Sequence, residues 1–539
     1  MILRSLLIGL CGAIVSSSQP AVAADSPLAD AAMKGDISAV RTLLSRKVDV
    51  NTAQGDGSTA LHWAVYNGNA EMVQMLLARG ANVKATTRLG ALTPLMMAAK
   101  SGDADIVQLL TDAKADVLSP NANGTTPLMF TAASGQASVV KLLLDRGADV
   151  NAADTTNGQT PLMFAAAQGR IDAVKLLTAR RADPNAITKV SPIITMTERY
   201  KKQTDGKGTR GITGEGGRSD VTAMGGMTAL MFAAREGYLD TVKELVTAGA
   251  DVNKVNGADS LSVLTLAIVN GHFDIAKFLL DSGANPKLTS KSGLGPLYAA
   301  VDAKWPERTW YPPASVTEEK TTYLELLHAL LQKGADPNVR LRIKPWYRTF
   351  HGDWADPVGA TAFWLAAKAD DVAAMKVLIA GGANPSIPST KGVSPLMVAA
   401  GYGLEPQVTN FAPQARLDAV RYLVEDCAAD VNAKDNQGYT PLHGAALTAN
   451  NELILYLVAM GAEVKARATS VFGGEGEDDQ TVTGGTGDTV ADMANGPRAH
   501  NMQFPETVDL LVRLGSENSN NCRYATCVIK TLPATTKKK

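Results

Sequence analysis

The chain has 539 residues, of which 45% are hydrophobic, 19% are charged and 5% are aromatic. Its 52 basic and 53 acidic residues give a formal net charge of −1, a balance that offers no field to gather the phosphates of a nucleic acid. After the first two dozen residues the sequence holds no apolar run of 18 residues, so we expect no membrane-spanning segment there.

The N-terminus has the pattern of a secretory signal peptide. Arg4 supplies a positive start, residues 5–15 are mostly apolar, and Ala21 and Ala23 form a small-x-small cleavage site. An apolar stretch of this length is too short to cross a bilayer and is removed on export. The sequence therefore predicts a signal peptide over residues 1–23 that is cleaved near Ala23.

One phrase then recurs along the chain. Copies read STALHWAVYNG from Ser58, LTPLMMAAKSG from Leu92, TTPLMFTAASG from Thr125, QTPLMFAAAQG from Gln159 and YTPLHGAALTA from Tyr439. The threonine at the head of the first four copies stands at positions 59, 93, 126 and 160, which is a period of 33 or 34 residues.

Each copy predicts two short helices. The Thr hydroxyl caps the first helix, and the Pro that follows occupies a position where its missing N–H costs nothing. A glycine such as Gly102, Gly135 or Gly169 ends this helix in a left-handed conformation. A V-x-x-L-L-L pattern has the spacing of a second helix, and a G-A-D-V-N phrase leads to the next copy.

The period and the wording of these copies resemble the ankyrin repeat. The resemblance implies an all-α fold, a solenoid of about twelve helix-turn-helix units with finger loops between them, over residues 24–516. The first unit, residues 26–50, and the last, from Asp488, have the wording of terminal caps, and residues 517–539 form an irregular tail. Ankyrin-repeat proteins mostly bind other proteins through their fingers and inner helices.

Five insertions interrupt the period. Three extend finger loops, near 187–225, 340–358 and 466–487, and two extend the turn between paired helices, near 304–321 and 402–415. Fingers and helix–helix turns lie at opposite ends of the helices in such a unit. Insertions of this size usually carry function or disorder.

Aromatic residues concentrate in the two insertions of a single unit. Large aromatic and Arg side chains dominate protein interfaces, and the same side chains also fasten loops to a core. Both interpretations remain open. The candidate partner-binding residues are Trp305, Trp310, Tyr311, Arg342, Trp346, Tyr347, Phe350 and Trp354.

Other patterns favour structure over chemistry. Methionines that recur after T-P-L occupy a position where ankyrin repeats often carry His, so we expect them to pack in the core (Met96, Met129, Met163, Met231 and Met397). The G-x-G-x-x-G match at residues 206–211 follows no predicted strand, and the acidic finger at 473–479 lacks the spacing of a calcium loop. The sequence contains no G-x-S-x-G, H-E-x-x-H, Walker A or C-x-x-C motif.

These observations predict a non-enzymatic scaffold that binds proteins through its concave face and its aromatic insertions. The signal peptide favours the periplasm of a bacterium, with secretion as the alternative, so the expected partners are proteins of the cell envelope and the chain is expected to be a monomer. No catalytic residue, metal or cofactor is assigned. Cys522 and Cys527 are a candidate disulfide, since exported proteins retain such bonds. The alternative function is an accessory protein that binds a small molecule, haem or a metal in the aromatic insertions and supports a redox enzyme of the envelope.

Overall fold

The computed structural model describes residues 26–192, 223–306, 316, 318–345, 355–404, 416–469, 487–495 and 504–519. The predicted signal peptide, residues 1–23, and residues 520–539 of the C-terminal tail therefore lie outside the described residues. The chain divides into two compact units, the first ending at Asp183 and the second beginning at Pro184. Each unit is described by itself.

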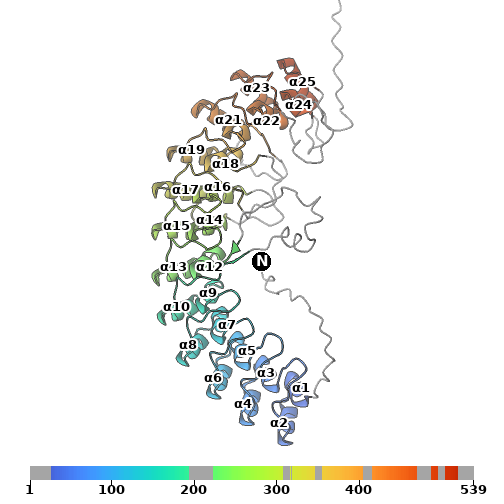
Figure 1. The fold of residues 1–539 in the computed structure, drawn as a ribbon, viewed down its shortest axis with the longest axis vertical. Helices are drawn as coiled ribbons and strands as arrows, with labels where there is room; N and C mark the ends of the chain where they lie inside the picture. The colour runs from blue at the N-terminus through green and yellow to red at the C-terminus, as the bar shows by residue number, and fades with distance from the viewer. Residues whose placement is uncertain are drawn as a thin grey trace, which may run out of the picture. The chain divides into compact units, whose positions relative to one another are not determined.

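Unit 1 consists of helices in consecutive pairs (Figure 1). The first helix of each pair packs on the first helix of the next, as α1 does on α3, and the second helices pack on one another in the same way. The helices are α1 (Pro27–Met33), α2 (Ile37–Ser45), α3 (Ala60–Tyr66), α4 (Ala70–Ala78), α5 (Pro94–Ser101), α6 (Ala104–Asp112), α7 (Pro127–Ser134), α8 (Ala137–Asp145), α9 (Pro161–Ala166) and α10 (Ile171–Ala179).

Unit 2 continues the same pairing after a two-stranded ribbon, β1 (Ser191–Pro192) and β2 (Ala223–Met224), which pair antiparallel at the base of the first finger insertion. The α21 helix passes into a short π-helix, which the sequence does not predict. The helices are α12 (Ala229–Glu236), α13 (Leu239–Thr247), α14 (Val263–Val269), α15 (Phe273–Asp281), α16 (Pro296–Lys304), α17 (Tyr323–Gln332), α18 (Ala362–Lys368), α19 (Val372–Ala380), α20 (Pro395–Ala399), α21 (Arg416–Arg421), η1 (Tyr422–Asp426), α22 (Pro441–Leu447), α23 (Asn451–Ala459), α24 (Val490–Ala494) and α25 (Pro505–Leu514).

The repeated phrase forms its helices in the way its residues predict. Thr93 Oγ1 accepts a hydrogen bond of 3.2 Å from the N–H of Met96 and so caps α5, while Pro94 begins the helix. Gly102 and Gly135 end α5 and α7 with φ of 78° and 83°, a region in which glycine is favoured. Gly169 is left-handed as predicted, with φ of 63°, but α9 ends earlier than expected, at Ala166 with Ala167 as its C-cap.

The core consists of the Leu, Ala, Val and Met side chains of successive helices. The methionines of the repeated phrase are at most 1% exposed, as the packing interpretation predicts (Met96, Met129, Met163, Met231 and Met397). Small alanines such as Ala98 and Ala132 allow neighbouring first helices to approach closely, which a larger side chain would prevent. The all-α repeat fold is thereby confirmed.

An asparagine at the end of the G-A-D-V-N phrase links each such repeat to the one that follows. In unit 1, Asn151 Oδ1 accepts a 2.8 Å bond from the N–H of Asp183, and its Nδ2 donates to the Arg181 carbonyl at 3.3 Å. In unit 2, Asn338 makes the same two bonds to Asn384 and Gly382, at 2.7 and 3.1 Å. The second pair spans the finger insertion at 340–358, so this insertion leaves the stacking of the repeats intact.

Among the described helices, none combines the length and the apolar content that a membrane crossing requires.

Candidate functional site

The structure describes two of the eight residues predicted to bind a partner, Trp305 and Arg342. The others, Trp310, Tyr311, Trp346, Tyr347, Phe350 and Trp354, lie outside the described residues. The same holds for Cys522 and Cys527, for the glycine-rich residues 206–211 and for the acidic residues 473–479.

Trp305 is half-buried at the C-terminal end of α16, where its side chain is held by internal bonds. Its indole Nε1 donates to Asp371 Oδ2 at 2.7 Å, and the Tyr323 hydroxyl donates to the same oxygen at 2.8 Å. Lys304 Nζ lies 5.2 Å from the Trp305 ring centroid and 5.3 Å from that of Tyr323, within the range of a cation–π contact. Burial, together with the adjacent Asp371 carboxylate, raises the pKa of Tyr323 well above its usual range.

Asp371 also caps α19, because its Oδ1 accepts a 2.9 Å bond from the N–H of Ala374. Asp371 is 1% exposed. Donors from three different segments, Trp305, Tyr323 and Ala374, therefore converge on one buried carboxylate. A buried carboxylate is stable only when such donors replace its lost water. Trp305 therefore fastens the start of the 304–321 insertion to the turn between α18 and α19.

Asp370 holds the end of the other turn insertion. Its Oδ2 accepts a bond of 3.2 Å from Nε of Arg416, the first residue of α21 and the first described residue after 402–415. Asp370 is 2% exposed, its Oδ1 is buried without a hydrogen-bond partner, and its φ is +54°. Burial raises the pKa of Asp370 to about 6, against the lowering effect of the Arg416 guanidinium. Two adjacent carboxylates thus hold one end of each turn insertion.

The far end of the 304–321 insertion is bound to the preceding pair of helices. The N–H and the hydroxyl of Thr321 both donate to Asp274 Oδ1 at 2.8 Å, and the N–H of Asp274 donates to Glu319 Oε2 at 2.7 Å. Burial acts to raise the pKa of Asp274, but the bonds from Thr321 and Lys320 outweigh it and lower that pKa. Both ends of this insertion are therefore fixed to the body of unit 2.

The ends of the second finger insertion are joined by backbone bonds. The N–H of Leu341 donates to the Ala360 carbonyl at 3.0 Å, and the N–H of Gly359 donates to the Leu341 carbonyl at 2.8 Å. Arg342 follows directly, with its backbone N–H bonded to the Ser292 carbonyl at 2.7 Å and its side chain exposed. Arg342 thus lies on an accessible finger, whereas Trp305 is packed at the turns.

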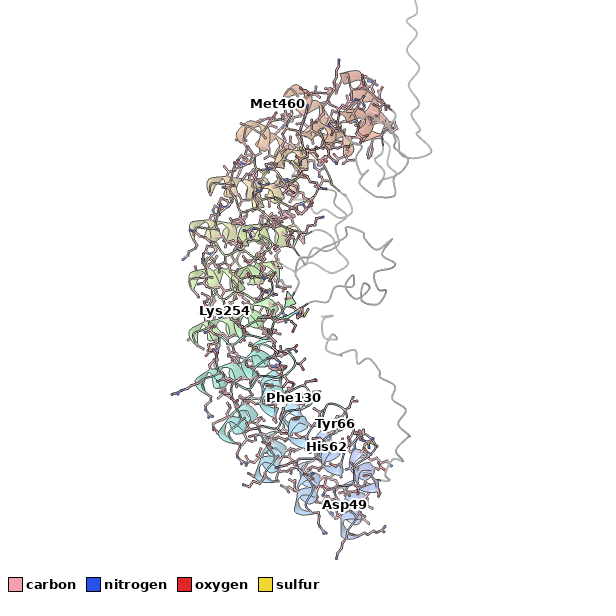
Figure 2. All side chains as sticks on the ribbon, in the orientation of Figure 1. Asp49, His62, Tyr66, Phe130, Lys254 and Met460 are labelled. Atoms are coloured by element: carbon pink, nitrogen blue, oxygen red, sulfur yellow. The ribbon has the colours of Figure 1, made fainter. Side chains whose placement is uncertain are left out.

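A row of large apolar side chains that the sequence analysis did not assign lies along unit 1. Trp63, Met97, Phe130 and Phe164, which we call the first-helix row, hold the same position in α3, α5, α7 and α9, and each is half-buried. Tyr66, on α3 one turn beyond Trp63, is 69% exposed, and the two ring centroids lie 5.7 Å apart. Figure 2 labels Tyr66 and Phe130 on the side of unit 1 that the first helices form.

The corresponding side chains of unit 2 are buried. Phe232, Leu266 and Leu365 are 6–7% exposed, and Val398 is fully buried. A signal for the row is present in the sequence, because the residue after Met or His in the repeated phrase is aromatic in three of the four copies in unit 1. The sequence pattern alone does not show how much of that side chain a neighbouring repeat covers.

The remaining titratable residues of the repeated phrase are structural. His62 Nδ1 lies 2.9 Å from the Thr59 hydroxyl, and its Nε2 lies 3.1 Å from the Leu92 carbonyl of the next repeat. His443 makes the same contact with Thr440, and burial lowers the pKa of His443 to about 4. In the part of the chain that the structure describes, His, Cys, Asp and Glu side chains do not gather in threes that could hold a metal ion.

Sequence models of one family match the chain. The model described as "Ankyrin repeats (3 copies)" matches residues 95–188 and 213–304, and the model described as "Ankyrin repeats (many copies)" matches residues 28–77 and 408–458. Together these matches cover about half of the chain.

Curated relatives share the repeats over part of their length. A putative palmitoyltransferase of Danio rerio is 28% identical over 234 residues, which are 43% of this chain and 29% of the relative. Alpha-latrocrustotoxin-Lt1a of Latrodectus tredecimguttatus is 26% identical over 211 residues, 39% of this chain and 13% of the toxin. Protein phosphatase 1 regulatory subunit 27 of Mus musculus is 37% identical over 92 residues, 17% of this chain and 59% of that subunit. The chain thus spans less than a third of the first two relatives.

Proposed function

Because the chain belongs to the family of ankyrin-repeat proteins, we propose that it is a non-enzymatic scaffold that binds partner proteins through the first-helix row of unit 1. The single observation that carries this proposal is the partial exposure of Trp63, Met97, Phe130 and Phe164 at four successive repeats. Contiguous apolar side chains at a surface cost solubility unless a partner covers them. Aromatic side chains are also the commonest anchors of protein interfaces.

The aromatic insertions are the second part of the proposed binding surface. Trp305 supports this part least, because its indole N–H is already bonded to Asp371. Arg342 supports it more, because this exposed residue lies at the start of the second finger insertion, whose sequence includes Trp346 and Trp354.

We also propose that the protein is exported and acts in the bacterial periplasm with proteins of the cell envelope. The support is the sequence of residues 1–23 alone, with Arg4, a short apolar stretch and the Ala21 to Ala23 cleavage site. Expression of the full chain in a bacterium, followed by intact mass measurement of the purified protein, tests export. A mature chain that begins near Ala24 supports it, and a full-length chain recovered from the cytoplasm contradicts it.

Binding is tested by capture of partners with a tagged full chain and matched variants. Phe130→Gln with Phe164→Gln removes the centre of the first-helix row, and Leu455→Gln replaces an exposed leucine of α23, a second helix, as the control. Mass spectrometry is expected to identify a partner that is lost with the double variant and kept with the control. A partner that both variants retain contradicts the row as the binding site, provided that all variants melt as folded proteins.

A further inference from the structure

Three cationic side chains surround an open depression between successive fingers of unit 2. The depression measures about 520 Å³, and its polar lining comes from Lys287, Thr289, Asp336, Arg340 and Arg342. Lys287 and Thr289 belong to one finger, and Arg340 and Arg342 belong to the next finger along the chain. The lining therefore combines three positive charges with one negative charge, in a chain whose formal net charge is −1.

The guanidinium of Arg340 is held in place by two backbone carbonyls. Its Nε donates to Gly359 O and its Nη2 donates to Pro388 O, both at 2.7 Å. An Arg side chain has five N–H donors, so these bonds fix the planar group and leave others for a ligand. A cation fixed in advance loses less conformational entropy on binding than a mobile one.

The other two cations have no carboxylate partner among the described residues. Ion pairs of the described residues include neither Lys287 nor Arg342, although Asp336 shares the same depression. The Asp336 carboxylate instead accepts a 2.9 Å bond from the N–H of Asn338. The backbone N–H of Arg342 is bonded to the Ser292 carbonyl, so the backbone that carries this exposed side chain is held in place.

We propose that this depression binds carboxylate side chains of an acidic segment in a partner protein, an inference that rests on the proposed scaffold function. Guanidinium groups match the planar geometry of carboxylates, and one fixed and one exposed Arg with a Lys can engage several acidic side chains of one segment. The depression is open to solvent, which suits a chain segment that lies across two fingers better than a small molecule that needs an enclosed pocket.

The test measures binding of a fluorescent ten-residue glutamate peptide to the full chain by anisotropy at low salt. Lys287→Glu with Arg342→Glu is expected to weaken binding about fivefold or more, because two attractions become repulsions. The matched control is Lys84→Glu with Arg88→Glu in unit 1. Lys84 follows Ala-Asn-Val as Lys287 follows Ala-Asn-Pro, and Arg88 bonds the Asp56 carbonyl as Arg342 bonds that of Ser292.

Equal weakening by both double variants would overturn the proposal, since the peptide would then follow net charge alone. Absence of peptide binding to the unaltered chain at low salt would overturn it as well. Unchanged melting by circular dichroism is required of every variant. Because the ligand is synthetic, a negative result removes the depression as a site and leaves the capture test of the scaffold function unaffected.

Discussion

Trp305 Nε1 and Asp371 Oδ2 form a 2.7 Å hydrogen bond between residues that are 66 positions apart in the chain. The tryptophan ends the first helix of one repeat, and the aspartate caps the second helix of the next. Tyr323 donates to the same oxygen, so the carboxylate joins three segments at the edge where the helix–helix turns lie. This bond assigns the Trp305 indole a role in holding the 304–321 insertion.

Replacement of Trp305 by Phe is expected to destabilise unit 2, because the buried Asp371 loses one of its donors. The cost is about 1.5–3 kcal/mol, the range for hydrogen bonds to a charged group. Tyr323→Phe removes the other donor and serves as the matched variant. Urea unfolding measures both free energies, and two unchanged values would show that Asp371 does not depend on these donors.

Replacement of Asp370 by Asn is expected to stabilise the protein at pH 7.5. The pKa of Asp370 rises from an ordinary 3.8 to about 6, so the folded state binds a proton more readily than the unfolded state. An ionised Asp370 therefore costs stability above pH 6, by about 1–3 kcal/mol, and this cost disappears as the pH falls from 6 towards 4. Asn keeps an acceptor for Arg416 without the buried charge.

Melting temperatures of Asp370→Asn and the unaltered chain at pH 7.5 and at pH 4.5 test this expectation. The variant should melt higher at pH 7.5, and the difference should shrink at pH 4.5. A variant that melts lower at pH 7.5 would mean that the ion pair with Arg416 outweighs the burial of the carboxylate.

Replacement of His443 by Met is expected to remove a loss of stability in mild acid. Burial lowers the pKa of His443 to about 4, below its ordinary 6.5, so the unfolded state takes up a proton between these values and the folded state does not. Stability is therefore lost as the pH falls from 6.5 towards 4. Methionine is a natural substitute, since Met129 Sδ accepts from the N–H of Thr126 much as His443 Nδ1 does from Thr440. Unfolding free energies at pH 7 and pH 5 provide the measurement, and equal pH dependence in both proteins would refute the expectation.

Replacement of Asn338 by Ala is expected to loosen the contact between the repeats on either side of the second finger insertion. Two hydrogen bonds to Gly382 and Asn384 are lost, at a cost of about 1–3 kcal/mol. Ser386 occupies the equivalent position in the next repeat, with an exposed side chain, so Ser386→Ala is the control. Chemical unfolding should separate the two variants, and equal stabilities would contradict a bridging role for Asn338.

The repeated phrase allows most of the fold to be predicted, because its signals act within a few residues. Thr93, Pro94 and Gly102 cap, begin and end one helix without help from distant segments. The exception is α9, which ends two residues earlier relative to Gly169 than α7 does relative to Gly135, although the sequence pattern is nearly unchanged. Local sequence signals predict where a helix lies, whereas its last residues also depend on how the neighbouring helices pack.

The contacts of the insertions could not be predicted in this way. Asp370 and Asp371 are adjacent in the sequence, yet one bonds Arg416 and the other bonds Trp305, at separations of 46 and 66 residues. Sequence alone left Trp305 equally suited to fastening and to binding, since an indole N–H needs an acceptor in either case. The hydrogen bond from Trp305 to Asp371, which only the three-dimensional structure shows, favours the fastening role. The repeated phrase predicts the helix that carries Phe130, but it does not predict how much of the Phe130 side chain the neighbouring repeats leave exposed.

Hydrogen–deuterium exchange of the full chain with and without its captured partner tests the central claim most directly. The account predicts that the partner slows exchange in peptides from α3, α5, α7 and α9, where the first-helix row lies, while peptides from the second helices α4, α6 and α8 keep their rates. Protection that is confined to the second helices would contradict the proposed binding face.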